Sequence, residues 1–421
     1  MMRYRQRNSK IDWWIVLLYF ALVGFGWLNI YSASMSDTQN IWDVTQIYSK
    51  QLIWILLSVV LIIFILAVEA KFYERFSSLI YLFALAALVG LYVFGQTVNG
   101  ATSWYAFGGF SIQPSEFAKT ATALALGKFV GDIQTNIRSW QDQWKSLLIM
   151  LLPALLIIPQ PDPGSALVYL AFILPLYREG LNYLFLTFAA ALGLLFIGTL
   201  LLEVQGIALL LLLVLGLYLW NQKRKRIRIK WGQSLIIFAL AIGFAYSVNY
   251  VFYSVFEQRH RDRINLVLGK TVDSNSIGYN THQSEIAIGS GRWWGKGWLQ
   301  GTQTKGNFVP EQHTDYIFST VGEEWGFMGS LFLISLFVAL ILRVLYRAEK
   351  QKSIFGRVYG YSVASILFIH FMINIGMVIG LLPTVGIPLP FISYGGSGLW
   401  GFTILLFIFV KLDSANYINI S

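Results

Sequence analysis

Long apolar runs alternate with short polar stretches along almost the whole chain. Several runs reach about 20 residues, the length of helix that crosses the hydrocarbon core of a bilayer. The pattern predicts twelve apolar segments, at residues 12–31, 52–69, 77–95, 113–130, 146–160, 164–177, 181–202, 206–220, 234–253, 325–346, 362–382 and 398–411. The fifth and sixth are short and separated by PQPDPGS, so we expect bent or partial helices there.

The composition agrees with this pattern. Of 421 residues, 56% are hydrophobic and only 12% are charged, whereas about 25% are charged in a soluble protein. We therefore predict an all-α fold, a polytopic integral membrane helix bundle that forms a single domain over residues 1–421. The first apolar run is too long for the core of a cleaved signal peptide, so it is interpreted as the first span. The absence of cysteine excludes disulfides and thiolate nucleophiles.

Basic residues set the expected orientation. The N-terminus and three later loops carry the sequences MMRYRQRNSK, KFYER, NQKRKRIRIK and RAEKQKSIFGR. Because Lys and Arg collect in cytoplasmic loops, we expect both termini in the cytoplasm, and the net charge of +10 does not require a nucleic acid partner. The opposite face then receives residues 96–112, 384–397 and a long extracytoplasmic loop, 254–315. Loops of this length are usually functional, so the chemistry is expected outside the cytoplasm.

One polar cluster, NGATSWYAFGGFSIQPSEFAK at 99–119, opens the fourth apolar segment. Pro114 stands at the expected helix start, where its missing N–H is harmless. Glu116 and Lys119 are three residues apart and share a helix face, so a local ion pair is one interpretation. Charges this deep in a span are costly and usually line a cavity, which is the interpretation we favour.

Two further clusters contain proline. In PQPDPGSA, 159–166, Asp162 is suited to cap the next helix, and capping is compatible with lining a cavity. The stretch GLLPTVGIPLPFISYGGSG, 380–398, is too rich in proline and glycine for a helix. Non-helical backbone at membrane depth is tolerated only inside protein or beside a water-filled cavity. A plain connecting loop is the alternative, and GGSG offers backbone N–H groups to an anion.

The remaining cluster, 278–315, is rich in glycine and tryptophan. SEIAIGSG is expected to form a short amphipathic helix at the membrane surface, and GRWWGKGW suits the membrane interface. Arg292, Lys296 and Lys305 are candidates to meet phosphates, either of a substrate or of ordinary lipid head groups. The cluster ends in VPEQHTD, which places Asp315 just before an apolar run.

Other polar residues have simpler interpretations. His370 and Asn374 lie four residues apart on one face of the eleventh segment, where interhelical hydrogen bonding is the default expectation. Glu323 and Glu324 open the tenth segment, where an acid favours a helix N-terminus.

These residues suit two classes of function. An outward-facing cavity with carboxylates, lysines and flexible backbone suits group transfer onto a hydroxyl: a carboxylate takes the proton and cations hold a phosphate leaving group. The same cavity suits a transporter of an anionic lipid. HExxH, Walker and G-x-S-x-G motifs are absent, and few histidines with no cysteine argue against a zinc site. The residue pattern alone leaves both classes open.

The four polar clusters, with SEIAIGSGRWWGKGWLQGTQTKGNFVPEQHTDYIFSTVGEEWGFMG as the longest match, resemble signature stretches of the SEDS family (shape, elongation, division and sporulation). They occur in the family's order and span most of the chain. GTQ at 301–303 and FVPEQHTDYIF are more similar to the elongation branch than to the division branch.

The resemblance implies a peptidoglycan glycosyltransferase. Such an enzyme polymerises lipid II into β-1,4-linked glycan strands on the outer face of the bacterial cytoplasmic membrane, for elongation and shape. Implied partners are lipid II, a class B penicillin-binding protein and other elongation-complex membrane proteins. The alternatives are a lipid II flippase, a division-type polymerase and a scaffold that only recruits a synthase. Whether a divalent cation, Mg²⁺ or Mn²⁺, assists at the diphosphate stays open, and no metal ligand is assigned.

The resemblance also implies roles for single residues. The family's essential acid in HTD is Asp315 here, the expected catalytic base. Its QPSExxK and QPD motifs fall on Glu116, Lys119 and Asp162. The other substrate-binding candidates within the matching stretches are Trp104, Lys296, Gln303, His313, Thr314 and Ser393. The family often has Arg where this chain has Ser103, so an anion contact by that Arg must come from Lys296 or Lys119.

The number of spans departs from the family's usual ten. Two segments, at about 206–220 and 234–253, are interpreted as inserted. An insertion of two spans preserves the sidedness of all that follows, whereas an insertion of one would place Asp315 in the cytoplasm.

Overall fold

The computed structural model describes residues 11–35, 45–98, 100–108, 110–226, 231–255, 258–268 and 277–416. Within these ranges the regular secondary structure is helical apart from one small sheet. The helices are α1 Trp13–Ser34, α2 Ile47–Ala67, α3 Ala70–Phe94, α4 Pro114–Gly131, α5 Trp140–Ile157, α6 Pro163–Val168, α7 Ile173–Glu179, α8 Tyr183–Arg224, α9 Trp231–Tyr250, α10 Gln258–Val267, α11 Ile277–Gly291, α12 Thr302–Lys305, α13 Ile317–Glu349, α14 Ile354–Val378 and α15 Gly396–Asn416. The basic N-terminal residues that set the expected orientation lie outside the described residues.

All twelve predicted apolar segments fall on helices. Among the described residues, eight helices are long and apolar enough to cross a membrane: α1, α2, α3, α8, α9, α13, α14 and α15. The fifth and sixth segments are irregular, as expected, because Pro153 lies inside α5 and a 3-10 turn, Tyr169–Phe172, separates α6 from α7. The prediction of an all-α membrane bundle is therefore confirmed.

Two predicted segments, 181–202 and 206–220, correspond to the two arms of α8. The arms meet at a kink, where Glu203 has non-helical backbone angles (φ 58°, ψ 173°). The break predicted between the two segments therefore falls on the kink. The long loop predicted at 254–315 is also largely helical in its described part, where it forms α10, α11 and α12.

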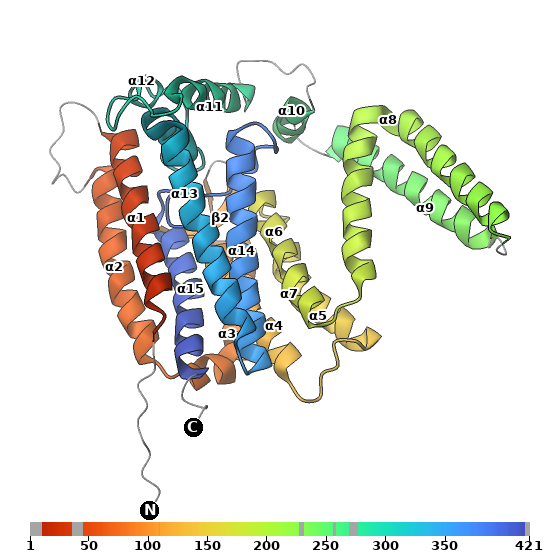
Figure 1. Cartoon of the computed structure of the whole chain (residues 1–421), viewed down its shortest axis with the longest axis horizontal. Helices are drawn as coiled ribbons and strands as arrows, with labels where there is room; N and C mark the ends of the chain where they lie inside the picture. Colours follow the sequence, from red (N-terminus) through yellow and green to blue (C-terminus); the bar gives the residue numbers. More distant parts are fainter. Residues whose placement is uncertain are drawn as a thin grey trace, which may run out of the picture. The chain divides into compact units, whose positions relative to one another are not determined.

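The chain divides into two compact units, residues 1–181 with 280–421 and residues 182–279. In the first unit α1, α2, α3, α13, α14 and α15 run side by side, and α11 and α12 lie across one end (Figure 1). The apolar windows of α14 and α15 are 67% and 72% buried, and most residues of α4 are buried as well, so these three helices form the core of the unit. The single domain predicted from the sequence stays a prediction.

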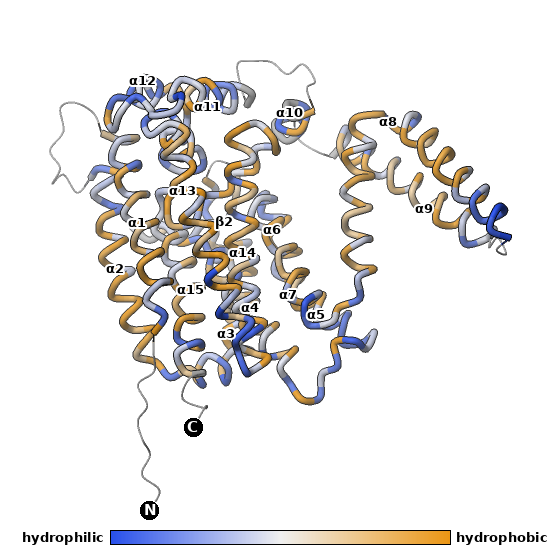
Figure 2. Tube along the Cα trace, viewed as in Figure 1, coloured by the Kyte–Doolittle hydropathy of each residue, from blue (hydrophilic) through white to orange (hydrophobic). Residues whose placement is uncertain are grey.

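The second unit is a helical hairpin. Leu200 of α8 packs against Val248 of α9 and Phe252. Most other side chains of the hairpin are apolar and exposed, and the end that contains residues 221–226 is hydrophilic (Figure 2). An apolar surface all around a helix is typical of a membrane environment.

The segment 96–112, expected as a loop, forms a small antiparallel sheet in the order β1-β2-β3. Its strands are β1 Gln96–Val98, β2 Ala101–Phe107 and β3 Phe110–Ile112. The backbone N–H of Thr102 donates to the carbonyl of Gln160 (3.1 Å), and the hydroxyl of Tyr105 donates to the carbonyl of Ala87 (2.8 Å). These bonds fix the sheet to α3 and to the PQPD stretch.

The kink in α13 yields a stability prediction. Gly326 has φ 64° and ψ −159°, a conformation open only to glycine, and a Cβ there would lie 2.3 Å from the backbone nitrogen of Gly295. We expect Gly326→Ala to lower the free energy of unfolding by at least about 2 kcal/mol, measured by thermal unfolding in detergent. Gly216→Ala in α8, where nothing lies within 4 Å, is the matched control. Equal stability of the two variants would contradict the kinked backbone at Gly326.

Candidate functional site

Asp315 lies in the non-helical segment just before α13 and is half-buried. Its backbone carbonyl accepts a hydrogen bond from Asn374 Nδ2 of α14 (2.8 Å). Its carboxylate faces Gly386, because a Cβ at Gly386 would lie 3.4 Å from Asp315 Oδ2. Gly386 has φ +72°, so a side chain there would be strained as well as close to the acid. The expected acid therefore faces the non-helical segment between α14 and α15, which we name the 380–395 loop.

Hydrogen bonds to backbone carbonyls join the HTD segment to the 380–395 loop. Ser393 Oγ donates to the carbonyl of Thr314 (2.6 Å) and accepts from the backbone N–H of Leu389 (2.8 Å). The backbone N–H of Tyr394 donates to the carbonyl of His313 (2.9 Å). Three predicted site residues, His313, Thr314 and Ser393, are thus brought together beside Asp315 from stretches about 80 positions apart in the chain.

The imidazole of His313 lies beside Glu311 and Tyr394. Burial lowers the pKa of its imidazole, and the carboxylate of Glu311 opposes this shift in part. Glu311 also accepts a hydrogen bond from Thr314 Oγ1 (3.0 Å). The ring centroids of His313 and Tyr394 are 5.8 Å apart. His313 is therefore suited to hydrogen bonding and packing rather than to supplying a positive charge.

Asp162 reaches the same loop through the helix it caps. It accepts hydrogen bonds from the backbone N–H and hydroxyl of Ser165 (3.0 and 2.7 Å), which confirms the predicted cap, and from Gln113 Nε2 (3.0 Å). Gly164, next to the cap, packs closely on the 380–395 loop, because a Cβ there would lie 2.4 Å from the carbonyl oxygen of Val385. The QPD stretch thus adjoins the loop that Asp315 faces.

Glu116 and Lys119 form the ion pair that was the alternative interpretation, and both are almost fully buried, while the favoured cavity-lining role stays a prediction. Lys119 Nζ lies 2.8 Å from each carboxylate oxygen of Glu116 and 3.0 Å from His370 Nε2, and the Phe402 ring centroid is 4.7 Å away. Side-chain exposure is 4% for Glu116 and 2% for Lys119. An ammonium has three protons, and these three contacts use all of them. A substrate phosphate would have to displace one of the present partners to reach Lys119.

Glu323 is a central residue that the sequence analysis missed. Its carboxylate, 0% exposed, accepts from Lys296 Nζ (2.7 Å) and from the backbone N–H groups of Gln303 and Thr304 (both 2.9 Å). It also accepts from the hydroxyl of Thr304 (2.8 Å). Two predicted site residues, Lys296 and Gln303, are thereby fastened to α13. The sequence signal for Glu323 was its position as an acid at the start of an apolar run. An acid there predicts a buried hydrogen-bond or charge partner, but it does not identify that partner.

The last predicted site residue, Trp104, lies on the small β-sheet. Trp104 is half-buried on β2 opposite Gln96 of β1, on the sheet rather than in the loop contacts described above.

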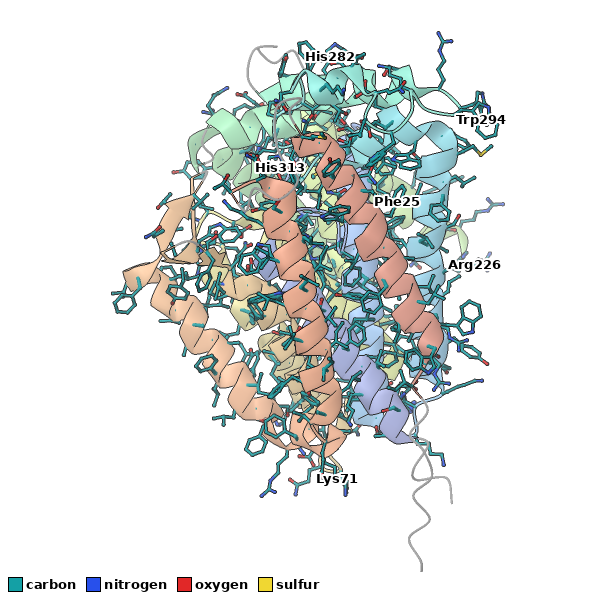
Figure 3. All side chains as sticks on the ribbon, turned by 90° about the vertical axis from the view of Figure 1, so that its left-hand side faces the viewer. Phe25, Lys71, Arg226, His282, Trp294 and His313 are labelled. Carbon is teal, nitrogen blue, oxygen red and sulfur yellow. The ribbon has the colours of Figure 1, made fainter. Side chains whose placement is uncertain are left out.

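His313 and His282 lie at one end of the first unit, and Lys71 lies at the opposite end (Figure 3). Across the described residues, no group of three or more histidines and acids is arranged to hold a metal ion.

The fold and the site define a polytopic membrane protein that holds a carboxylate between two non-helical loops at one end of a helix bundle. The family model of the cell cycle proteins FtsW, RodA and SpoVE matches residues 12–229 and 206–418, and the chain belongs to this family. The two matched ranges overlap at 206–229, within the region predicted to carry the insertion.

Two curated relatives cover most of the chain. The peptidoglycan glycosyltransferase MrdB of Escherichia coli K12 is 31% identical over 391 residues, covering 92% of this chain and 90% of the relative. The peptidoglycan glycosyltransferase RodA of Treponema pallidum (strain Nichols) is 33% identical over 422 residues, covering 93% and 95%. A solved chain of a peptidoglycan synthase complex that coordinates polymerization and crosslinking has the same fold, with a TM-score of 0.70, 23% identity and coverage of 97% and 98%.

The Glu323 contacts predict a local effect. Glu323→Ala leaves two backbone N–H groups and an ammonium without their acceptor, so we expect a loss of about 3 kcal/mol in unfolding free energy. Limited trypsin digestion in detergent should show faster cleavage after Lys296 and Lys305. Glu69→Ala, at an exposed acid, is the control. Unchanged cleavage at both lysines in folded Glu323→Ala protein would contradict the assigned contacts.

His313 predicts a pH effect on stability. Its folded-state pKa is lowered below the ordinary value of about 6.5, so the unfolded chain binds the proton more tightly. Stability is therefore lost as the pH falls from about 6.5 through the folded-state pKa. Thermal unfolding between about pH 5 and pH 7.5 should show a smaller loss at acidic pH for His313→Gln than for the wild type. Parallel curves for the two proteins would contradict this prediction.

Proposed function

We propose that this chain, a peptidoglycan glycosyltransferase, polymerises lipid II by an inverting transfer in which Asp315 is the general base. The observation that carries the proposal is the position of Asp315. Its carboxylate faces Gly386, and its backbone bonds to α14 beside the 380–395 loop, so segments from distant parts of the chain converge on one acid. The family and its named peptidoglycan glycosyltransferases support the reaction class.

The reaction needs one base and one stabilised leaving group. The donor MurNAc carbon is bonded to undecaprenyl diphosphate in the α sense, and the product is β-1,4-linked, so one displacement inverts the centre. The GlcNAc 4-hydroxyl oxygen of the acceptor forms the new bond, and the bond to the diphosphate breaks. Asp315 takes the hydroxyl proton, and the electron pair leaves with the diphosphate.

Lys296 is the better placed cation for the diphosphate. Its ammonium contacts Glu323 Oε1 (2.7 Å) and Thr302 Oγ1 (2.8 Å), and its side chain is 26% exposed. Those contacts use two of three protons, whereas the contacts of buried Lys119 use all three. Gln303, fixed by Glu323 in the same turn, is proposed beside Lys296.

The other family-matched residues are proposed around the sugars. Thr314 and Ser393 lie next to the base, and Asp162 caps the helix whose Gly164 packs on the 380–395 loop. Trp104 is proposed to contact the sugars from the side of the β-sheet. The assignments of Thr314, Ser393 and Asp162 rest on the family match and on their position beside the 380–395 loop, and that of Trp104 rests on the family match.

The cellular setting is part of the proposal. We place the chain in the bacterial cytoplasmic membrane with both termini in the cytoplasm and Asp315 on the outer side, because basic loops mark the cytoplasmic face. A class B penicillin-binding protein is the proposed partner, supported by the shared fold with a chain of a peptidoglycan synthase complex. Other elongation-complex membrane proteins are proposed on the same basis.

The deciding experiment uses purified full-length protein and labelled lipid II in detergent, with and without the partner. Detergent provides no second compartment, so a flippase yields no product there. Glycan chains formed by the chain alone establish the enzyme. Chains formed only when the partner contributes its own glycosyltransferase would establish a scaffold and overturn the proposal. The same assay titrated with a chelator tests the requirement for a divalent cation.

The role of Asp315 predicts the behaviour of one variant. Asp315→Asn keeps the shape of the side chain and removes its basicity, so we expect synthesis to fall by at least about 100-fold with unchanged thermal stability. Asp132→Asn, at an exposed position, is the matched control. Polymerisation at the wild-type rate by Asp315→Asn would remove Asp315 from the mechanism.

A further inference from the structure

Helix α14 carries two buried polar side chains that bond to non-helical backbone. His370 is 1% exposed and Asn374 is 0% exposed, and they lie one helical turn apart. The expected interhelical bond is present for His370, which contacts Lys119 of α4. Asn374 differs from that expectation, because its amide bonds to backbone carbonyls and not to another helix.

Asn374 binds both sides of the proposed active site. Nδ2 donates to the carbonyl of Asp315 (2.8 Å) and to the carbonyl of Ile387 (2.8 Å). Both partners are acceptors, so the amide nitrogen must occupy this position. Within the described part of the chain, its buried Oδ1 has no hydrogen-bond partner. A buried acceptor without a partner is energetically costly, and the two hydrogen bonds that Nδ2 donates offset this cost.

His370 holds the next residue of the same loop. Its Nδ1 lies 3.3 Å from the carbonyl oxygen of Pro388, and its Nε2 lies 3.0 Å from Lys119 Nζ. The ammonium is only a donor, so Nε2 must accept and the ring proton must be on Nδ1. The ring is therefore a neutral Nδ1–H tautomer, and the Glu116–Lys119 pair fixes it in this state.

The 380–395 loop requires these donors. Pro383, Pro388 and Pro390 remove backbone N–H groups from it, and its carbonyls lie within the protein beside α14, where unpaired polar groups are costly. Asn374 and His370 pair two consecutive carbonyls, those of Ile387 and Pro388. Gly386, which faces the carboxylate of Asp315, directly precedes them.

We propose that Asn374 and His370 form a clamp that positions Asp315 against the 380–395 loop, and that the Glu116–Lys119 pair acts on the reaction through His370. The inference rests on the proposed function, in which Asp315 is the base. The four residues are positioning residues, since each is buried, with at most 4% of its surface exposed. A displacement of about 1 Å at a reacting group costs about 100-fold in rate, which is the scale expected for loss of the clamp.

The test compares purified full-length variants in the lipid II polymerisation assay. Asn374→Leu and His370→Phe remove the clamp bonds. His370→Gln restores one acceptor for Lys119 and one N–H for Pro388. Asn221→Leu and His282→Phe make the same replacements at exposed positions and serve as matched controls. Turnover, KM for lipid II and thermal unfolding are measured for each.

The clamp predicts a kcat defect. Asn374→Leu and His370→Phe should lose about 10- to 100-fold in kcat with little change in KM, and His370→Gln should recover part of it. Wild-type kcat in both removal variants, or a raised KM with unchanged kcat, would overturn the clamp while leaving the proposed function intact. Absence of polymer with the wild-type protein would instead overturn the proposed function.

A spectroscopic measurement on the His370 ring tests the clamp if the clamp-removing variants fold poorly. The chain has four histidines, so ¹⁵N-histidine labelling gives few signals, and His370→Gln identifies the one from His370. The wild type should show the neutral Nδ1–H tautomer, and Lys119→Met should shift its Nε2 signal. A protonated Nε2 in the wild type would overturn the arrangement of protons on which the clamp depends.

Discussion

The site depends on the pairing of backbone carbonyls in a loop that cannot be helical. The 380–395 loop contains three prolines and bonds to α14, a largely buried helix of the first unit. Its polar backbone must find donors inside the protein, since unpaired groups there are costly. Asn374 and His370 donate to carbonyls of the loop, and Ser393 Oγ accepts from a backbone N–H within it. Asn374 and Ser393 also donate to backbone carbonyls of the HTD segment. The constraint that stabilises the loop therefore also fixes the position of Asp315.

Two ion pairs of the first unit are organised in different ways. The Glu116–Lys119 pair is sealed inside the bundle, where its ammonium is fully used by Glu116 and His370. The Lys296–Glu323 pair is half open, because Lys296 remains partly exposed while Glu323 is completely buried. Breaking a buried pair by removing one partner is strongly destabilising, so the sealed pair is suited to fixing structure. The open pair is suited to meeting a charged ligand.

Much of the fold followed from local signals in the sequence. Runs of about 20 apolar residues predict the long helices, and the Asp162–Pro163 pair predicts a capped helix. The spacing of Glu116 and Lys119 places them on one helix face, where an ion pair was the less favoured of two interpretations. The missing parts depend on contacts between distant segments. Nothing near Glu323 in the sequence indicates that it binds the turn at 302–304, and nothing near Asn374 indicates that its amide bonds to Asp315.

A double-mutant cycle between Asp315 and Asn374 tests most directly whether the clamp works through the base. Asp315→Glu retains a carboxylate but displaces it, so some turnover should remain to be measured. If Asn374 acts only by positioning Asp315, adding Asn374→Leu to Asp315→Glu should lower kcat little further than the larger single loss, because residues that act as a unit are not additive. If the two losses multiply instead, Asn374 and Asp315 act independently, which would contradict the positioning role of Asn374.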